Sequence, residues 1–137
     1  MSEQTSGTST RRPPNILIVD DSAMMRAMIR RATSVCGVPI GEIYEAADGR
    51  EALALLEAKT VDALFTDINM PVMSGTELLR AMEKDGRWTG LLRVIISTDG
   101  SAARRAEADA LHVRLYVEKP FRPEAVRDVL SQLATNA

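Results

Sequence analysis

Short apolar runs alternate with longer amphipathic segments along the chain. The run NILIVD at 15–20 is apolar on both faces and too short for a helix, which is typical of a central parallel strand. The next segment, 22–37, carries Met25, Met28 and Ile29 at helical spacing. The same alternation continues and predicts strands at 15–20, 42–46, 61–67, 91–97 and 115–119, and helices at 22–37, 48–59, 74–86, 101–111 and 123–134.

Local signals mark several ends of the predicted helices. Asp48 is suited to be an N-cap, and Ser74 with Glu77 forms the S-x-x-E spacing of a capping box. Pro123 falls in the first turn of the last helix, where its missing N–H removes no hydrogen bond. Gly37 is expected to stop the first helix.

Five strand–helix units predict an α/β fold with a doubly wound, five-stranded parallel sheet and right-handed crossovers. The 137 residues contain no internal repeat and suit one domain, which we place at 15–137. The preceding segment 1–14 is polar and of low complexity, without the apolar core of a signal peptide. We expect it to be a disordered tail.

The polar residues at the strand ends carry the candidate chemistry. The carboxyl ends of parallel strands meet at one edge of the sheet, where open α/β folds bind ligands. Strand two ends in Ala46-Ala47 and contributes nothing, as expected of an edge strand. The other strand ends supply Asp20, Asp21, Asp67, Ser97, Thr98 and Lys119. Each has an ordinary explanation alone, but three clustered carboxylates repel one another unless a cation lies between them.

The type of these side chains indicates which cation and which chemistry. Oxygen ligands without His or Cys favour a hard cation over zinc, and few carboxylates leave water positions that suit Mg²⁺ better than Ca²⁺. A magnesium ion beside a carboxylate and an amine is equipped for phosphoryl transfer. The sequence therefore predicts Asp67 as a nucleophile held next to a metal.

The composition is that of an ordinary soluble domain, with 45% hydrophobic residues, 26% charged residues and a net charge of −2. No charge excess points to nucleic acid or an anionic membrane, and no apolar stretch approaches membrane-spanning length. We expect a soluble, cytoplasmic monomer. The arginine pairs are expected on the solvated surface, at Arg11-Arg12, Arg30-Arg31 and Arg104-Arg105.

Two sets of sulfur-containing side chains have plain structural explanations. Cys36 has no partner for an internal disulfide and is expected to be a buried, unreactive thiol. Met24, Met25 and Met28 are expected to pack in the core and not to form a binding surface.

Four motifs together resemble one protein family. The motifs are LIVDDSAMMR, TDINMPVMSG, IIST and YVEKPF. Their order and spacing resemble the receiver domain of two-component response regulators, most closely the single-domain chemotaxis (CheY-like) type. The resemblance spans residues 15–134 and implies the flavodoxin-like strand order 2-1-3-4-5.

The resemblance implies a role for each site residue. Asp67 would accept a phosphoryl group from a phosphohistidine on a sensor histidine kinase. Asp21, Asp67 and the backbone carbonyl of Asn69 would bind Mg²⁺, which Mn²⁺ can replace, with Asp20 acting nearby or through water. Lys119 would pair with a phosphoryl oxygen, and the Lys119–Pro120 peptide bond is expected to be cis. The protein would catalyse only its own phosphorylation and dephosphorylation, and would not be an enzyme acting on other substrates.

The resemblance also implies an output. Ser97 would hydrogen-bond the phosphoryl group, Tyr116 would move inward, and the face of the fourth helix, fifth strand and fifth helix would change. The partner would be the flagellar motor switch or another signalling protein, with a phosphatase as a further partner. Asn69 and Asp99 would flank the acyl phosphate, where small polar side chains can hold a water. We therefore expect decay in seconds to minutes.

Two departures from the family concern the switch and the output face. Ser97 stands where threonine is commoner, which keeps the hydroxyl but loosens the rotamer. The turn 109–112 reads Asp-Ala-Leu-His where many relatives have a small Gly-Ala pair. His112 is expected at the surface, and is not a candidate phosphoacceptor.

Particular residues disfavour two alternatives, and a third is left open. An aspartyl phosphatase of the haloacid-dehalogenase type needs a second aspartate where this chain has Asn69. A flavin-binding module needs a Ser/Thr/Gly loop where Asp20 and Asp21 would repel the phosphate. A phosphorelay intermediate, which passes the phosphoryl group on to a histidine, is compatible with the sequence.

Overall fold

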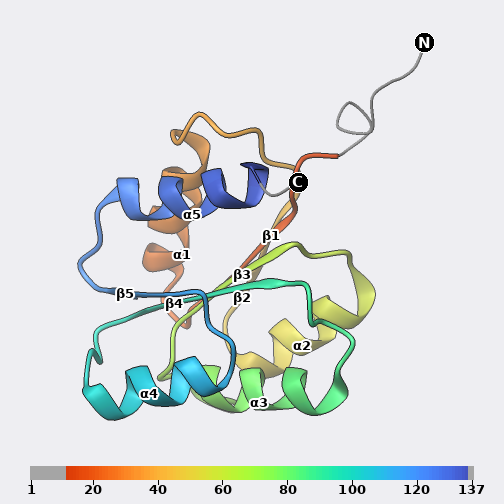
Figure 1. The fold of residues 1–137 in the computed structure, drawn as a ribbon, viewed down its shortest axis with the longest axis vertical. Coiled ribbons are helices and arrows are strands. Elements are labelled where there is room, and N and C mark those ends of the chain that lie inside the picture. Colours follow the sequence, from red (N-terminus) through yellow and green to blue (C-terminus); the bar gives the residue numbers. More distant parts are fainter. Residues whose placement is uncertain (1–11, 136–137) are drawn as a thin grey trace.

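Strands and helices alternate throughout the computed structural model, which describes residues 12–135 (Figure 1). The elements are β1 (Ile16–Val19), α1 (Ala23–Ser34), β2 (Ile43–Ala46), α2 (Gly49–Ala58), β3 (Ala63–Thr66), α3 (Gly75–Asp85), β4 (Leu92–Ser97), α4 (Ala102–Ala110), β5 (Leu115–Glu118) and α5 (Pro123–Thr135). Each of the ten predicted elements is present, within a few residues of its predicted ends.

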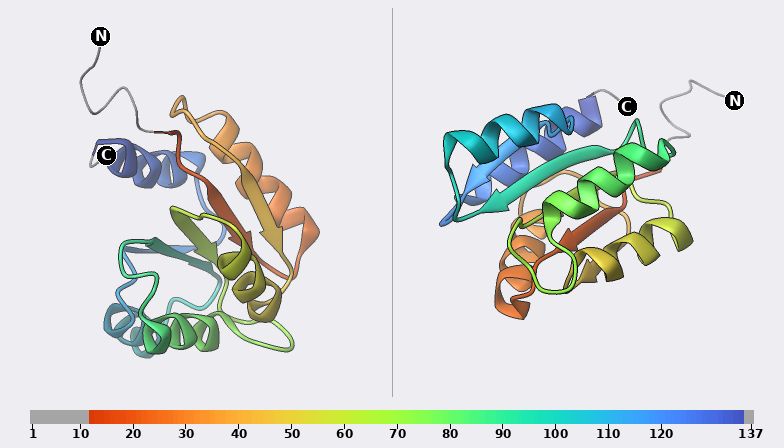
Figure 2. Two further views of the ribbon diagram at one scale, coloured as in Figure 1. Left: turned by 90° about the vertical axis from the view of Figure 1, so that its right-hand side faces the viewer. Right: turned by 90° about the horizontal axis from the view of Figure 1, so that it is seen from below.

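The five strands form one parallel sheet in the order β2-β1-β3-β4-β5. Helices α1 and α5 cover one face, and α2, α3 and α4 cover the other (Figures 1 and 2). The predicted α/β fold and its flavodoxin-like strand order are confirmed. The carboxyl ends of all five strands therefore meet along one edge of the sheet. Strand β2 is an outermost strand, with a neighbour on one side only.

Strand β1 is buried on both faces, and its side chains alternate between two cores. Leu17 and Val19 lie in the core under α2, α3 and α4, whereas Ile16 and Ile18 lie in the core under α1 and α5. Burying one such aliphatic side chain stabilises the fold by roughly 1.5–3 kcal/mol. The two cores hold the central strands from both sides, so the loops at their carboxyl ends start from fixed positions.

The predicted helix starts are confirmed by their capping contacts. The Asp48 side chain accepts a hydrogen bond from the Glu51 N–H at 2.9 Å. Ser74 accepts from the Glu77 N–H at 3.1 Å, and the Glu77 carboxylate accepts from the Ser74 N–H at 2.9 Å, which completes the capping box. Pro123 is the first residue of α5.

Helix α1 differs from its prediction in length and in the direction of its methionines. It ends at Ser34, three residues before the predicted stop. Met24 is 75% exposed and Met28 is 48% exposed, so the prediction that they pack in the core is wrong. The buried stripe runs through half-buried Met25 and buried Ile29. Because each residue advances the helix by roughly 100°, Met24 and Met28 lie beside that stripe, toward solvent.

Two further predictions about burial need correction. Cys36 is half-buried and not buried, and its Sγ donates to the Thr33 carbonyl at 3.0 Å. Arg104 and Arg105 are also half-buried and engaged in ion pairs, because α4 folds back over charged groups of the neighbouring loop and strand. Arg12, Arg30 and Arg31 are exposed, as predicted, and Arg11 lies outside the described residues.

One charged side chain is buried within β4. Arg93 is 2% exposed, pairs with Glu83, and donates to the carbonyls of Leu111 and Trp88, each at 3.0 Å. Its Nε has no hydrogen-bond partner among the described residues. His112 is exposed as predicted, has a φ of 62°, and places its Nδ1 2.8 Å from Glu83. This cluster ties α3 to the turn before β5.

Most of the predicted disordered tail, residues 1–11, lies outside the described residues. The described part of that segment lies against the domain: Arg12 pairs with Asp62 at 2.6 Å, and the Pro14 carbonyl accepts from the Gly41 N–H at 2.8 Å. Among the described helices, none combines the length and apolarity that a membrane span requires.

Candidate functional site

Three aspartates converge at the carboxyl edge of the sheet. Asp20 follows β1, Asp67 follows β3, and Asp21 is next to Asp20 along the chain. One carboxylate oxygen from each lies within 4.8 Å of the others. Asp20 is 1% exposed and Asp67 is 9% exposed, whereas Asp21 faces solvent. An all-oxygen, acidic donor set with one open side fits a hard divalent cation such as Mg²⁺.

Lys119 supplies the positive charge that this cluster needs. Its Nζ donates to Asp20 Oδ2 at 2.8 Å and to Asp67 Oδ2 at 2.9 Å. Desolvation lowers the pKa of Lys119, but the hydrogen bonds and charges of the two aspartates outweigh it, so the pKa lies above its usual value. The Lys119–Pro120 peptide bond is cis, as predicted. The amine therefore stays protonated between two buried acids.

The backbone around Asp20 is fixed by contacts that the sequence did not reveal. The Ser22 N–H donates to Asp20 Oδ1 at 2.9 Å, and Ser22 also caps α1. Arg26 donates to the Asp20 carbonyl at 2.6 Å, and its Nε donates to Glu45 at 2.9 Å. An arginine one turn into the helix after an acid pair is the only sequence signal for this brace. These contacts with α1, which is itself joined to β2 through Arg26 and Glu45, fix the position of Asp20.

Gly75, the first residue of α3, lies very close to the backbone of Asp67. A Cβ at this position would lie 1.9 Å from the Asp67 carbonyl oxygen, so only glycine fits. The Gly75 N–H donates to the Ile68 carbonyl at 2.8 Å, and the Ile68 N–H donates to Asp67 Oδ1 at 2.6 Å. Asn69, two residues after Asp67, is exposed. The carboxylate of Asp67 is therefore held by the backbone on one oxygen and by Lys119 on the other.

Ser97 ends β4 and is fully buried, whereas the next residue, Thr98, is exposed. The Ser97 hydroxyl accepts a hydrogen bond from the Asp99 N–H at 3.2 Å. Of the two adjacent hydroxyls, Ser97 is thus the one that points into the fold, on the strand next to β3.

Tyr116 on β5 reaches the same loop from the other side. Its hydroxyl donates to the Asp99 carbonyl, and the Arg105 guanidinium lies 4.6 Å from the centre of its ring. Arg105 also pairs with Glu118 at 2.8 Å. Burial, followed by the charge of Asp99, raises the pKa of Tyr116. In this structure the half-buried tyrosine ring therefore packs against Arg105 of α4.

The structure brings together most of the predicted site. Contacts or short distances join Asp20, Asp21, Asp67 and Lys119, and a chain of hydrogen bonds joins Ser97, Asp99 and Tyr116.

Comparisons with known proteins identify the family of the chain. Residues 16–131 match the family described as "Response regulator receiver domain". The chain is 35% identical over 123 residues to the chemotaxis protein CheY1 of Helicobacter pylori, covering 88% of this chain and 98% of that protein. It is 35% identical over 118 residues to the chemotaxis protein CheY of Pseudomonas aeruginosa, covering 86% and 94%.

A solved structure gives the same result for the fold. The chemotaxis protein CheY4 of Vibrio cholerae is 31% identical and superposes with a TM-score of 0.78, covering 89% of this chain and 99% of that one. The chain thus matches these relatives along nearly their full length. The chain belongs to the response regulator receiver domains of two-component signalling.

Proposed function

We propose that Asp67 takes a phosphoryl group from a phosphohistidine on a sensor histidine kinase, in a Mg²⁺-dependent reaction. The observation that carries this proposal is the buried Asp67 carboxylate between Lys119 and the other two acids. In the transfer, an Asp67 oxygen forms a bond to phosphorus as the phosphorus–nitrogen bond of the donor breaks. The electron pair of that bond returns to the histidine ring.

Asp20, Asp21 and Asp67 would hold the cation, with the backbone carbonyl of Asn69. The ion, when bound, supplies positive charge to the phosphoryl oxygens of a loose transition state. Lys119 adds a second positive charge, because its ammonium already lies 2.9 Å from Asp67. Its low exposure, 12% of the side chain, keeps water from screening that charge.

Ser97 and Tyr116 would transmit the phosphorylation of Asp67 to the loop before α4. When Ser97 turns its hydroxyl toward the phosphoryl group, its hydrogen bond with the Asp99 N–H is released. The backbone between Ser97 and Asp99 can then move, while Ser101 and Arg104 keep their contacts with the Asp99 carboxylate. Tyr116 is attached to that loop through the Asp99 carbonyl. A ligand shifts a conformational equilibrium only through contacts that differ between the two states, and these two hydrogen bonds supply such contacts.

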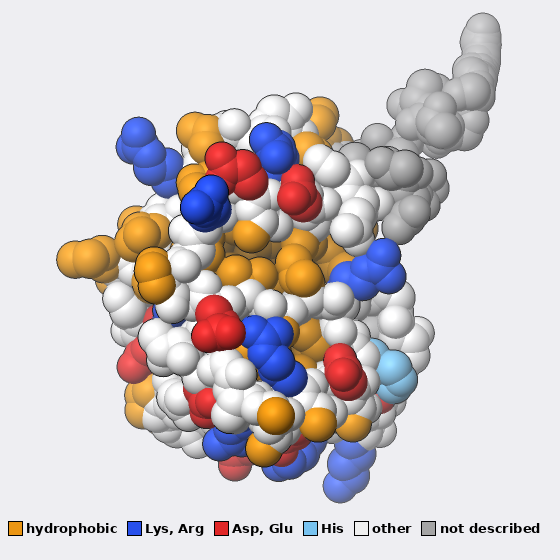
Figure 3. Space-filling view, turned by 60° about the vertical axis from the view of Figure 1, so that its left-hand side comes forward, with side chains coloured by type: hydrophobic (Ala, Val, Ile, Leu, Met, Phe, Trp, Pro, Cys, Tyr) orange, Lys and Arg blue, Asp and Glu red, His pale blue; other side chains and the backbone are white. Residues whose placement is uncertain are grey.

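The face of α4, β5 and α5 would bind the partner. Figure 3 shows an apolar band across this side of the molecule with acidic and basic side chains above and below it. Leu115 on β5 is 37% exposed, which is high for a leucine in a strand. The partner would be a component of the flagellar motor switch or another signalling protein, and the similarity to chemotaxis proteins supports an output of this kind. We expect a cytoplasmic monomer to bind it.

Labelling of Asp67→Asn tests this function. Wild type incubated with acetyl phosphate and Mg²⁺ should gain one phosphoryl group by intact-mass measurement, and chelator should prevent it. Asp67→Asn should gain none, while Asp128→Asn, an exposed acid on α5, should label normally. Full labelling of Asp67→Asn, or labelling without a divalent cation, would refute the assignment.

A further inference from the structure

Asp99 is held at four points beside the candidate site. Its N–H donates to Ser97 and its carbonyl accepts from Tyr116. One carboxylate oxygen accepts from the Ser101 N–H at 3.1 Å, and the other lies 3.4 Å from Arg104 Nε. The Ser101 hydrogen bonds, followed by the Arg104 charge, hold the pKa of Asp99 below its usual range. The side chain is therefore an ionised carboxylate with a defined direction.

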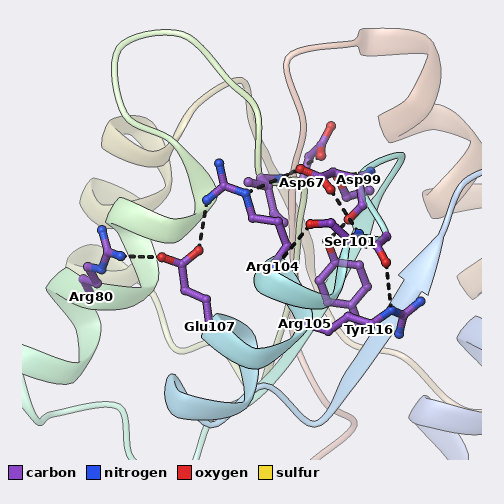
Figure 4. Close-up of polar contacts among 11 residues, drawn as sticks. Asp67, Arg80, Asp99, Ser101, Arg104, Arg105, Glu107 and Tyr116 are labelled. Carbon is purple, nitrogen blue, oxygen red and sulfur yellow. Dashed lines mark hydrogen bonds and ion pairs between the residues drawn. The ribbon is translucent and has the colours of Figure 1, made fainter.

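Arg104 is itself fixed by a chain of alternating charges that crosses from α4 to α3 (Figure 4). Its Nη1 donates to Glu107 Oε1 at 2.9 Å, and Glu107 Oε2 accepts from Arg80 on α3. The same guanidinium thus uses one edge for Asp99 and another for Glu107. This is a fork geometry that the single ammonium of a lysine does not reproduce.

The chain of charges ends at Asp99, on the loop next to the one that carries Asp67. Asp67 follows β3 directly, Asp99 lies two residues beyond the end of β4, and these two strands are neighbours in the sheet. Both loops leave the same edge in the same direction. Asp99 therefore lies on the loop next to the one that carries Asp67, while Glu107 lies on α4 and Arg80 on α3.

We propose that Arg104, braced by Glu107 and Arg80, is a positioning residue that holds the Asp99 carboxylate in place to orient the water that hydrolyses phosphorylated Asp67. The proposal rests on the proposed function of Asp67. It assigns the lifetime of the signal to a contact between two helices, at a distance from the acids that carry the chemistry.

The hydrolysis sets the geometric demand on Asp99. The water oxygen forms a bond to phosphorus as the bond between phosphorus and the Asp67 oxygen breaks. The electron pair stays on the Asp67 carboxylate, and the protons of the water remain on the released phosphate or pass to solvent. A water in line with the breaking bond reacts fastest, so a carboxylate that fixes its orientation shortens the lifetime.

Decay of the phosphorylated protein tests the proposal. Each variant is labelled with acetyl phosphate and Mg²⁺, the donor is removed, and the labelled fraction is followed with time. Arg104→Gln should decay about three- to tenfold more slowly than wild type, in the range of coupling between contacting residues. Arg104→Lys should also decay slowly, because lysine keeps the charge but not the fork. Glu107→Gln should be slowed less, since only the brace is lost.

Three controls separate positioning from other effects. Arg127→Gln removes an arginine of similar exposure on α5 and should decay as wild type does. Arg104→Gln should add nothing in an Asp99→Ala background, because its action requires the carboxylate. The melting temperature of each variant should stay near that of wild type, since exposed ion pairs contribute little to stability.

The possible results have distinct meanings. Unchanged decay in Arg104→Gln, full rescue by Arg104→Lys, or an equal effect of Arg104→Gln without Asp99 would each overturn the positioning role. In those cases labelling of Asp67 itself would still stand. A wild type that takes no label at Asp67 would overturn the proposed function and this inference with it.

Discussion

Asp20, Asp21 and Asp67 are the same amino acid at one edge of the sheet, but their surroundings differ. Asp20 and Asp67 are buried and share the Lys119 ammonium, whereas Asp21 is exposed and has no such partner among the described residues. A buried carboxylate beside a fixed cation suits a nucleophile, because its charge is not screened by water. An exposed carboxylate suits the entry of a hydrated ion. The roles proposed for the three acids therefore follow from burial and from the position of one lysine.

The two adjacent hydroxyls at the end of β4 allow a test of switching at the level of single residues. Ser97→Ala should still be phosphorylated at Asp67, but Tyr116 should no longer respond, since the contact that distinguishes the two states is lost. The chain has two tyrosines, so ¹⁹F NMR of fluorotyrosine-labelled protein gives two signals, which a Tyr44→Phe variant assigns. Phosphorylation should shift the Tyr116 signal in wild type and not in Ser97→Ala.

Thr98→Ala is the matched control, because this substitution also removes a hydroxyl and Thr98 is exposed. It should keep the Tyr116 shift. A normal shift in Ser97→Ala, with a lost shift in Thr98→Ala, would move the switch to Thr98.

At the scale of elements, helix boundaries were predictable wherever a side chain forms its own cap. Ser74, Glu77 and Asp48 mark helix starts because their capping partners are three residues away in the same chain. Which face of a helix packs against the core was less predictable. Met24 and Met28 are exposed because α1 buries another stripe, and that choice depends on how α1 packs against α5 and the sheet. Tertiary packing decides which stripe is buried, and the residues of the helix alone do not reveal that packing.

The end of α3 provides a test of backbone conformation. Gly86 is the C-cap, with a φ of 82°, and no atom lies within 4 Å of a Cβ added there. Gly86→Ala should therefore reduce the free energy of unfolding by about 1–2 kcal/mol through left-handed backbone strain alone. Gly90→Ala is the control, because Gly90 has equal space but no left-handed φ, and its effect should be small. Urea unfolding measures both, and equal effects would contradict the explanation.

At the scale of the whole molecule, topology joins residues that are far apart in sequence. Lys119 and Asp20 lie 99 positions apart, and β3 and β4 separate their strands in the sheet. Adjacent strands are spaced by about 4.8 Å, so only a long side chain can cross from β5 to the acids. The parallel pattern predicted that these ends share one edge. It did not predict the contacts made by long arginine side chains, such as buried Arg93 or the link from Arg104 to α3, because their direction depends on neighbours from other elements.

We expect the acid cluster to make the stability of the whole domain depend on divalent cations. Three carboxylates with one lysine repel one another, so an ion that binds only the folded chain should relieve that repulsion. At a hundredfold excess over its Kd, Mg²⁺ should stabilise wild type by about 2.7 kcal/mol, which corresponds to a rise in Tm of roughly 10 °C. Asp21→Asn should lose most of this rise. Asp20→Asn should lose less, because the Asp20 carboxylate already pairs with Lys119. Calorimetry at constant ionic strength, with NaCl in place of MgCl₂, separates ion binding from screening. An equal rise in wild type and Asp21→Asn would place the cation elsewhere.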